Sequence, residues 1–418
     1  MGQLRRTVSF ATGLYRRNVD VAIAGYLRRD PMALLQLRPG RDDPYAIYAR
    51  MRRDGPLLPT RLGNWVTTSH PLCHQVLRDR RFGVRPAGRA VPDPATDDID
   101  LSFLEMNPPD HTRLRRLTQP AFSPKRMAGY QPRIERTVER LLDRAQAAGT
   151  FDLIPTLASP LPIAVITDLL GVPDADADDF ARYGTVIGGA LDGIRSVSHA
   201  ARLQAASWEL ATLFDGLFAL RRREPADDLV SQLVAAQGDQ VKPAELLPLC
   251  VLLLIAGFET TVNLIGNAVN ALLDHPAQWA ALCADPAGLS GPAIEETLRF
   301  DPPVQRTGRF ALEPVELDGR PVRRGQFVVT LIGAANRDPS IYPEPDRFDI
   351  HREPTADHLA FSSGIHYCVG QPLARLEATV ALRSLAERLP GLRRAGRTRR
   401  RTSNTIRGPI HLPVRVGR

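Results

Sequence analysis

Residues 358–377 read HLAFSSGIHYCVGQPLARLE, and they indicate the fold more clearly than any other part of the chain. Their pattern is an ordered set of aromatic, glycine, histidine and cysteine positions: Phe361, Gly364, His366, Cys368 and Gly370. Glycines on either side of Cys368 let backbone N–H groups approach the sulfur. The helix expected after Pro372 points its positive N-terminal end toward the same atom. Both effects favour a thiolate over a thiol.

An anionic sulfur on a backbone loop, shielded by Phe361, suits the thiolate ligand of a haem iron. The alternative for Cys368 is a buried free cysteine, which is the usual fate of a lone cysteine. Its neighbours argue against that alternative. The other three cysteines form no CxxC pair and lack the spacing of a zinc or iron–sulfur site, so they are expected to be structural: Cys73, Cys250 and Cys283.

This segment resembles the haem-binding loop of cytochrome P-450 monooxygenases of the soluble bacterial type, and the resemblance runs from about Asp43 to the C-terminus. It implies a mainly α cytochrome P-450 fold. It also implies haem b (iron protoporphyrin IX) bound by Cys368, with Phe361 and Gly370 against the cofactor. Bacterial members usually have glycine directly after the phenylalanine, whereas this chain has Ser362.

The composition is that of a globular protein, with 418 residues, 43% apolar residues and a net charge of +8. All but two of the 54 basic residues are arginines, and they are scattered without interleaved aromatics, so no nucleic-acid partner is expected. The dense run 393–401 is interpreted as a solvated surface turn. The longest apolar run, 246–258, is shorter than the roughly 20 residues of a membrane span. We expect a cytoplasmic monomer without a membrane partner.

Helical periodicity dominates the chain. It predicts helices that end at Gly149, run from Pro243 to about Asp274, and follow Pro372. Strands are predicted over 63–68, 315–322 with a turn at Asp318-Gly319, and 326–332. We therefore expect a single domain, 1–418, with one large helical part, a small β-rich lobe and an N-terminal extension over 1–42. Two stretches, 82–103 and 337–354, are expected to be irregular.

The stretch NPPDHTRLRRL, residues 107–117, places His111 and Arg115 one helical turn apart on the same face. Two such groups suit a dianionic partner, such as the haem propionates, although a surface helix with ordinary charges is the alternative. In the resemblance the matching residues have that role. It adds Arg309 and His366 as two further propionate contacts.

The Glu296-x-x-Arg299 pair lies on a predicted helix that ends at Pro302-Pro303. The spacing alone is uninformative, because about two such pairs are expected by chance in this composition and two occur. The resemblance implies a buried ion network in which Arg347 joins this pair. That network would be structural rather than catalytic.

Residues 256–261, AGFETT, lie inside the long apolar helix, where glycine, threonine and a buried glutamate are unfavourable. One reading is a helix kink whose polar groups are satisfied. The other is a groove where the helix crosses the haem. The resemblance assigns Thr260 a hydrogen bond to dioxygen and Glu259 a proton relay. Ala256 and Gly257 would leave room for dioxygen and substrate.

The resemblance implies a monooxygenase that inserts one oxygen atom of O₂ into a C–H bond or alkene of an organic substrate in natural-product biosynthesis. No flavin or nicotinamide module is visible, so a ferredoxin and its reductase are expected to supply electrons. Exposed arginines such as Arg113 and Arg116 are candidates for the docking face. Alternatives are oxidative coupling or rearrangement, a non-catalytic haem protein, and a helical scaffold without haem. Five segments are expected to line the substrate pocket: 82–103, 180–205, 253–260, 304–307 and 404–406.

Overall fold

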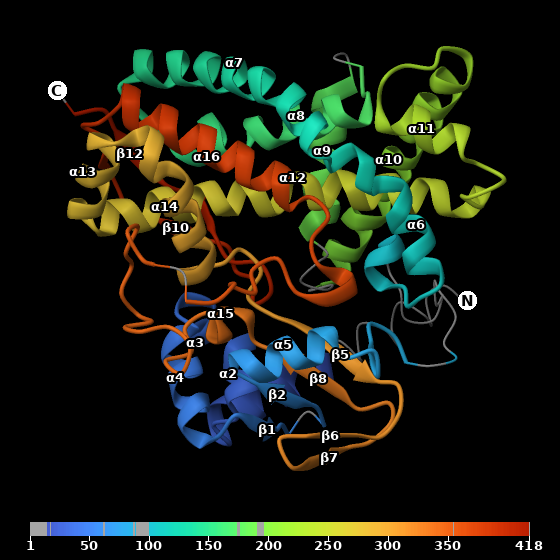
Figure 1. Ribbon diagram of the computed structural model, residues 1–418, viewed down its shortest axis with the longest axis vertical. Coiled ribbons are helices and arrows are strands. Elements are labelled where there is room, and N and C mark those ends of the chain that lie inside the picture. The colour runs from blue at the N-terminus through green and yellow to red at the C-terminus, as the bar shows by residue number, and fades with distance from the viewer. Residues whose placement is uncertain are drawn as a thin grey trace.

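Helices make up most of the molecule; the five-stranded sheet and the β6–β7 hairpin lie at one end of it, whereas β10 and β12 lie among the helices (Figure 1). This computed structural model describes residues 15–417 except 17, 62, 87, 89–99, 174–175, 190–195 and 354. The α-helices are α2 Pro31–Gln36, α3 Arg38–Asp42, α4 Tyr45–Asp54, α5 His70–Arg78, α6 Asp110–Thr118, α7 Pro124–Ala148, α8 Pro160–Leu170, α9 Ala177–Gly188, α10 Val197–Arg223, α11 Leu229–Ala235, α12 Pro243–Asp274, α13 Pro276–Ala284, α14 Pro286–Phe300, α15 Ile332–Ala335 and α16 Gln371–Arg388. Short turns of tighter or wider helix are η1 Ile23–Leu27, η2 Ser102–Glu105, η3 Gln119–Phe122, η4 Ile154–Ala158 and η7 Gly364–His366.

The strands are short. They are β1 Leu57–Pro59, β2 Trp65–Thr67, β3 Phe82–Gly83, β4 Thr150–Asp152, β5 Thr307–Ala311, β6 Val315–Leu317, β7 Arg320–Val322, β8 Phe327–Thr330, β9 Arg393–Arg394, β10 Arg399–Arg400, β11 Pro409–His411 and β12 Pro413–Arg415. Five of them form one sheet in the order β1-β2-β8-β5-β3, in which only β2 and β8 pair in parallel. The predicted hairpin is confirmed as β6–β7, where Asp318 and Gly319 both have positive φ, as a tight two-residue turn requires.

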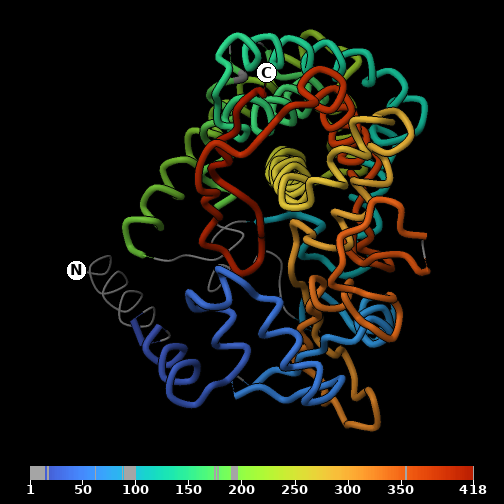
Figure 2. Tube along the Cα trace, turned by 90° about the vertical axis from the view of Figure 1, so that its left-hand side faces the viewer, coloured from blue at the N-terminus to red at the C-terminus, as the bar shows by residue number. Residues whose placement is uncertain are grey.

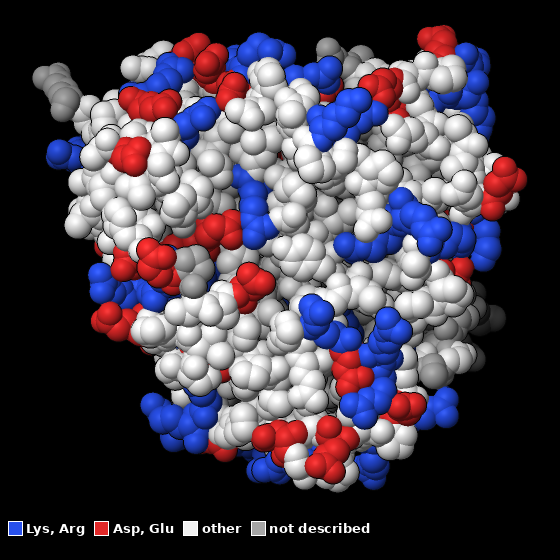
Figure 3. All heavy atoms as spheres, in the orientation of Figure 1, with Lys and Arg blue, Asp and Glu red and all other residues white. Residues whose placement is uncertain are grey.

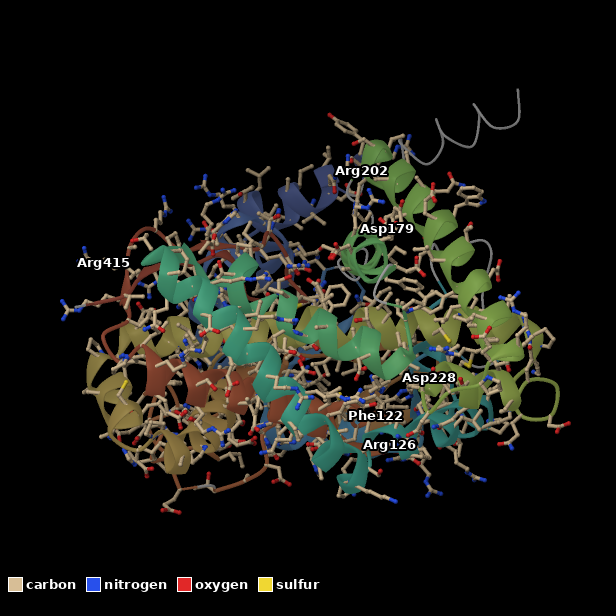
Figure 4. All side chains as sticks on the ribbon, turned by 90° about the horizontal axis from the view of Figure 1, so that it is seen from above. Phe122, Arg126, Asp179, Arg202, Asp228 and Arg415 are labelled. Atoms are coloured by element: carbon tan, nitrogen blue, oxygen red, sulfur yellow. The ribbon has the colours of Figure 1, made fainter. Side chains whose placement is uncertain are left out.

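Helix α12 lies at the centre of the helical part, and Figure 2 shows it nearly end-on with other helices around it. It begins at Pro243 and ends before His275-Pro276, as predicted, because proline is favoured in a first turn and cannot continue a helix. Helices α8, α9, α14 and α16 contact it, and Figure 4 shows α9 and α10, marked by Asp179 and Arg202, lying together at one end. By length and composition α12 could span a membrane, yet 78% of its most apolar window is buried inside the protein. Its apolar surface therefore serves as the core.

The N-terminal segment is described from residue 15. Met32 and Leu35 of α2 are buried against Tyr48 and Val329, so this part of the 1–42 extension packs on the β-rich lobe. Most of the expected irregular stretch 82–103 lies outside the described residues. In the second expected irregular stretch, 337–354, the described residues 337–353 form neither helix nor strand, as predicted.

The basic run 393–401 differs in part from its interpretation as a solvated turn. Arg393, Arg397 and Arg399 are exposed, as that interpretation expects. By contrast, Arg394 pairs with Asp274 at 2.6 Å, and Arg400 pairs with the buried Asp301 at 3.4 Å. The interpretation therefore holds for only part of the run, because sequence alone does not reveal which of its arginines meet acidic partners in the fold.

Candidate functional site: the Cys368 loop and α12

The Cys368 loop is closed by its own backbone. The N–H of Cys368 donates to the carbonyl of Phe361 at 2.9 Å, and the N–H of Tyr367 donates to that of Gly364 at 3.0 Å. Gly364 has φ +70°, and a Cβ there would lie 2.4 Å from the carbonyl oxygen of Leu77. Glycine is therefore required at this position by both conformation and space.

Ser362 occupies the position where glycine is usual in bacterial relatives of this loop. Its φ is +65°, in the region that L-residues rarely adopt. Its hydroxyl is buried without a hydrogen-bond partner among the described residues. The loop thus keeps the backbone geometry that a glycine would favour, at some cost in stability.

Cys368 lies just before the N-terminal end of α16, and the residue is partly accessible to solvent. Desolvation by the surrounding protein nevertheless raises the pKa of its thiol. The backbone N–H groups of Gly370 and Gln371 lower that pKa, as the sequence predicted, and the charges of Arg115 and Arg375 lower it too, but desolvation outweighs all of them. A thiolate here therefore needs a further positive partner, and coordination to a metal ion deprotonates a thiol outright.

Four cationic or hydrogen-bonding side chains gather beside this loop, from α6, β5 and η7: His111, Arg115, Arg309 and His366. The rings of His111 and His366 are 4.2 Å apart, and Arg115 donates to the carbonyl of Tyr367. The buried Arg309 makes its hydrogen bonds to Gly308 and Thr307 of its own strand.

The charged groups that shift the pKa of His111 and His366 are all cationic. Burial, followed by the positive charges of Arg115 and Arg309, lowers the pKa of His111 to about 4. Burial and the same neighbours also lower the pKa of His366. Both ring nitrogens of His111 and Nε2 of His366 are buried without a hydrogen-bond partner among the described residues. The residues present therefore fit a bound dianion, which supports a haem held by its propionates here and by Cys368 at the iron.

On α12, Ala256 is exposed and Thr260 is half-buried, whereas most of the helix is buried. They lie one turn apart on the same face, and the hydroxyl of Thr260 donates to the carbonyl of Ala256 at 3.2 Å. Gly257 has a different role from the one expected. A Cβ there would lie 2.5 Å from Cδ1 of Ile166, so this glycine lets α8 pack closely on α12 rather than leaving room for a ligand.

Glu259 is buried, and its carboxylate pairs with Arg401, which precedes β11 in the C-terminal region. Asn263 donates from its amide to the carbonyl of Glu259 at 2.6 Å. The sequence singled out Glu259 but not this partner. The only sequence feature that pointed to Arg401 was the basic run 393–401 in which it lies.

The Glu296–Arg299 pair is confirmed as buried, with two hydrogen bonds of 2.7 and 2.8 Å. The third arginine was predicted wrongly. Arg352, not Arg347, places its guanidinium against Glu296 at 3.2 Å. Arg347 contributes its backbone carbonyl to Arg299 at 3.0 Å, and its side chain pairs with Glu344. Both arginines belong to one irregular segment, so only its path shows which of them turns inward.

Arg375 is a further residue that sequence reasoning did not single out. Its guanidinium lies 4.6 Å from the ring centroid of Phe361 and pairs with Glu295 at 2.6 Å. His358, at the start of the loop stretch, contacts the same carboxylate at 3.1 Å. These contacts tie the Cys368 loop to α14 and α16.

Comparison with known proteins agrees with this geometry. A family model described as Cytochrome P-450 matches residues 292–389. Cytochrome P-450 107B1 of Saccharopolyspora erythraea is 42% identical over 396 residues, 90% of this chain and 95% of its own. The 6-deoxyerythronolide B hydroxylase of the same organism is 38% identical over 90% of this chain and 96% of its own. The ligand-free structure of Mycobacterium smegmatis CYP164A2 superposes with a TM-score of 0.84 at 41% identity, covering 92% of this chain and 99% of that one. The chain therefore belongs to the cytochrome P-450 family of monooxygenases, which bind haem b through a cysteine thiolate.

Proposed function

We propose that this chain inserts one oxygen atom of O₂ into a C–H bond or alkene of a small to medium organic substrate. The observation that carries the proposal is the group of four cationic or donor side chains beside Cys368, whose buried imidazole nitrogens lack partners among the described residues. Such a group fits the propionates of a haem whose iron Cys368 ligates.

In this proposal each side chain has one task. His111, Arg115, Arg309 and His366 hold and orient the propionates, while Phe361 and Gly370 lie against the cofactor, as Ala256 does from α12. When bound, the haem would supply the oxygen-activating chemistry, with Cys368 as its thiolate ligand. Thr260 holds a proton at Oγ1, and Glu259 passes protons through water to that hydroxyl group. Excluding other water limits the wasteful release of peroxide.

A polyketide or a similar natural product is the proposed substrate class. The relative named 6-deoxyerythronolide B hydroxylase supports it, because macrolide hydroxylases of natural-product pathways are among the relatives of this chain. Hydroxylation is favoured over oxidative coupling by the Glu259–Thr260 pair. Screening polyketides, peptides and terpenoids for a substrate-induced shift of the haem spectrum tests the class, and a response restricted to another chemical class would overturn it.

A separate ferredoxin with its reductase is the proposed electron donor. Basic side chains gather over α6 on the face shown in Figure 3. Arg116 of α6 is exposed, but Arg113, expected as a docking residue, already pairs with Glu245 at 2.7 Å and Asp110 at 2.8 Å. Docking thus rests on Arg116 rather than Arg113. A steep fall of the reduction rate with salt supports it, and a salt-independent rate contradicts it. The cytoplasmic location stays a prediction.

The experiment that tests the proposed function is spectral and catalytic. The reduced carbon monoxide complex of the wild-type protein should show the red-shifted Soret band of a thiolate-ligated haem. Cys368→Ser should lose that band and all turnover, with folding followed by circular dichroism as the control. A protein that binds haem through Cys368 but forms no product with substrate, O₂ and reductant would instead be a non-catalytic haem protein.

A further inference from the structure

The C-terminal turn 401–408 is fixed against the middle of α12. A Cβ on Gly408 would lie 2.0 Å from Oδ1 of Asn263, so the backbone of Gly408 packs directly against the side chain of Asn263. Asn267, one turn further along α12, donates to the carbonyl of Arg407 at 3.0 Å. Within the turn, the N–H of Arg401 donates to the carbonyl of Gly408 at 3.0 Å. These contacts fix the position of Arg401 relative to α12.

The side chain of Arg401 reaches Glu259 from this turn. The side chain of Glu259 is 4% exposed and that of Arg401 is 19% exposed, so the ion pair is largely withdrawn from water. A buried carboxylate is unfavourable unless it is paired or protonated. The ion pair with Arg401 meets that requirement and restrains the direction in which the carboxylate of Glu259 points.

The same turn borders residues expected to line the substrate pocket. The N–H of Gln305 donates to the carbonyl of Thr405 at 2.8 Å, and Arg306 donates to Oδ1 of Asn404 at 2.9 Å. Val304 and Ile406 form an isolated antiparallel bridge. The turn 401–408 thus contacts both the segment 304–307, which is expected to line the pocket, and Glu259 of α12.

We propose that Arg401 is a positioning residue for proton delivery, which holds the carboxylate of Glu259 in a fixed orientation next to Thr260 through their ion pair. This inference deepens the proposed function and rests on the relay role of Glu259. In this role Arg401 need not touch the substrate or the reacting oxygen. It acts through Glu259, which must exchange a proton with water while remaining aligned with Thr260.

The test compares three variants of the holoenzyme. Arg401→Met removes the charge, Arg401→Lys keeps it, and Arg400→Met is the matched control. Arg400 is the neighbouring arginine, has a similarly buried side chain and pairs with Asp301 rather than Glu259. We expect Arg401→Met to lower kcat about tenfold, since proton-transfer groups contribute about a hundredfold or more. KM should stay within about twofold, because only an interaction specific to the chemical step is lost.

Two readouts separate positioning from a purely structural role. The fraction of electrons that leaves as peroxide and the solvent deuterium isotope effect should rise in Arg401→Met, recover in Arg401→Lys and stay unchanged in Arg400→Met. Thermal unfolding of Arg401→Met, Glu259→Gln and the double variant should show that the two single effects are not additive, as expected for contacting side chains.

The outcomes distinguish this inference from the proposed function. If Glu259→Gln leaves both the peroxide fraction and the isotope effect unchanged, the relay role of Glu259 is wrong and the inference falls with it. If Glu259→Gln changes both readouts but Arg401→Met matches Arg400→Met, the relay stands and the role of Arg401 is refuted. If Arg401→Met fails to fold, Arg401→Lys decides: wild-type readouts support the charge requirement, whereas altered ones contradict it.

Discussion

The buried carboxylate of Glu296 allows a direct comparison of two arginines in one irregular segment. The guanidinium of Arg352 donates from Nε to both oxygens of Glu296, at 3.2 and 3.3 Å. Its other nitrogens donate to the carbonyls of Pro343, Glu344 and Arg347, at 2.6, 3.2 and 2.8 Å. The side chain of Arg352 is 14% exposed and that of Arg347 is 57% exposed. Replacing each by methionine, which keeps most of the apolar stem, should therefore have unequal effects.

Breaking a buried ion pair by removing one partner typically costs about 3–5 kcal/mol. Arg299 still pairs with Glu296 in the Arg352→Met variant, so we expect the lower end, about 3 kcal/mol. Arg347→Met removes only exposed pairs, worth at most about 1 kcal/mol. Its carbonyl, which accepts from Arg299 and Arg352, is kept in any substitution.

Thermal unfolding of the two holoproteins, followed by circular dichroism at one scan rate, measures this difference. The entropy of unfolding for a chain of 418 residues is about 0.9 kcal/mol per kelvin. Arg352→Met should therefore lower Tm by about 3 °C and Arg347→Met by about 1 °C or less. Equal shifts, or a larger shift for Arg347→Met, would refute the assignment of Arg352 as the inward arginine.

Three further substitutions and one pH experiment test the site. Ser362→Gly relieves a positive φ and removes a buried hydroxyl that has no hydrogen-bond partner among the described residues, so Tm should rise by about 1 °C; a fall in Tm would contradict backbone strain at Ser362. Gly364→Ala should lower the haem-to-protein ratio, whereas Gly129→Ala, which meets nothing within 4 Å, should not. The pKa of His111 is lowered to about 4 from 6.5, so its neutral form contributes stability above pH 6.5 that is lost as pH falls toward 4. The Tm of the haem-free protein should fall across that window, and less so in His111→Gln. Thr260→Ala should raise the peroxide yield per electron pair, and unchanged coupling would reject its role.

Local features of the chain were predictable. The bounds of α12, the β6–β7 hairpin and the helix after the Cys368 loop follow from proline placement, turn residues and apolar spacing. The pairing of His111 with Arg115 on one face follows from helical geometry alone. Each of these depends on residues within about one helix or turn of one another, where backbone geometry dictates the neighbours.

Contacts between distant segments were not predictable in the same way. The chain has many chemically equivalent arginines, and nothing in their sequence context distinguished Arg352 from Arg347 or marked Arg401 as the partner of Glu259. The role of Gly257 also depended on a neighbour, Ile166 of α8, that lies far away in the sequence.

The order of residues alone was enough to establish a cysteine loop ahead of a helix, a cationic helix face and a long apolar helix interrupted by polar groups. The packing of remote elements determined which guanidinium meets which buried carboxylate. It also determined the pKa of the Cys368 thiol, on which desolvation acts more strongly than the backbone N–H groups of the loop. The physical reason is range. Charge pairing and desolvation act over a few ångströms through space, and that proximity exists only after the helices and turns have packed.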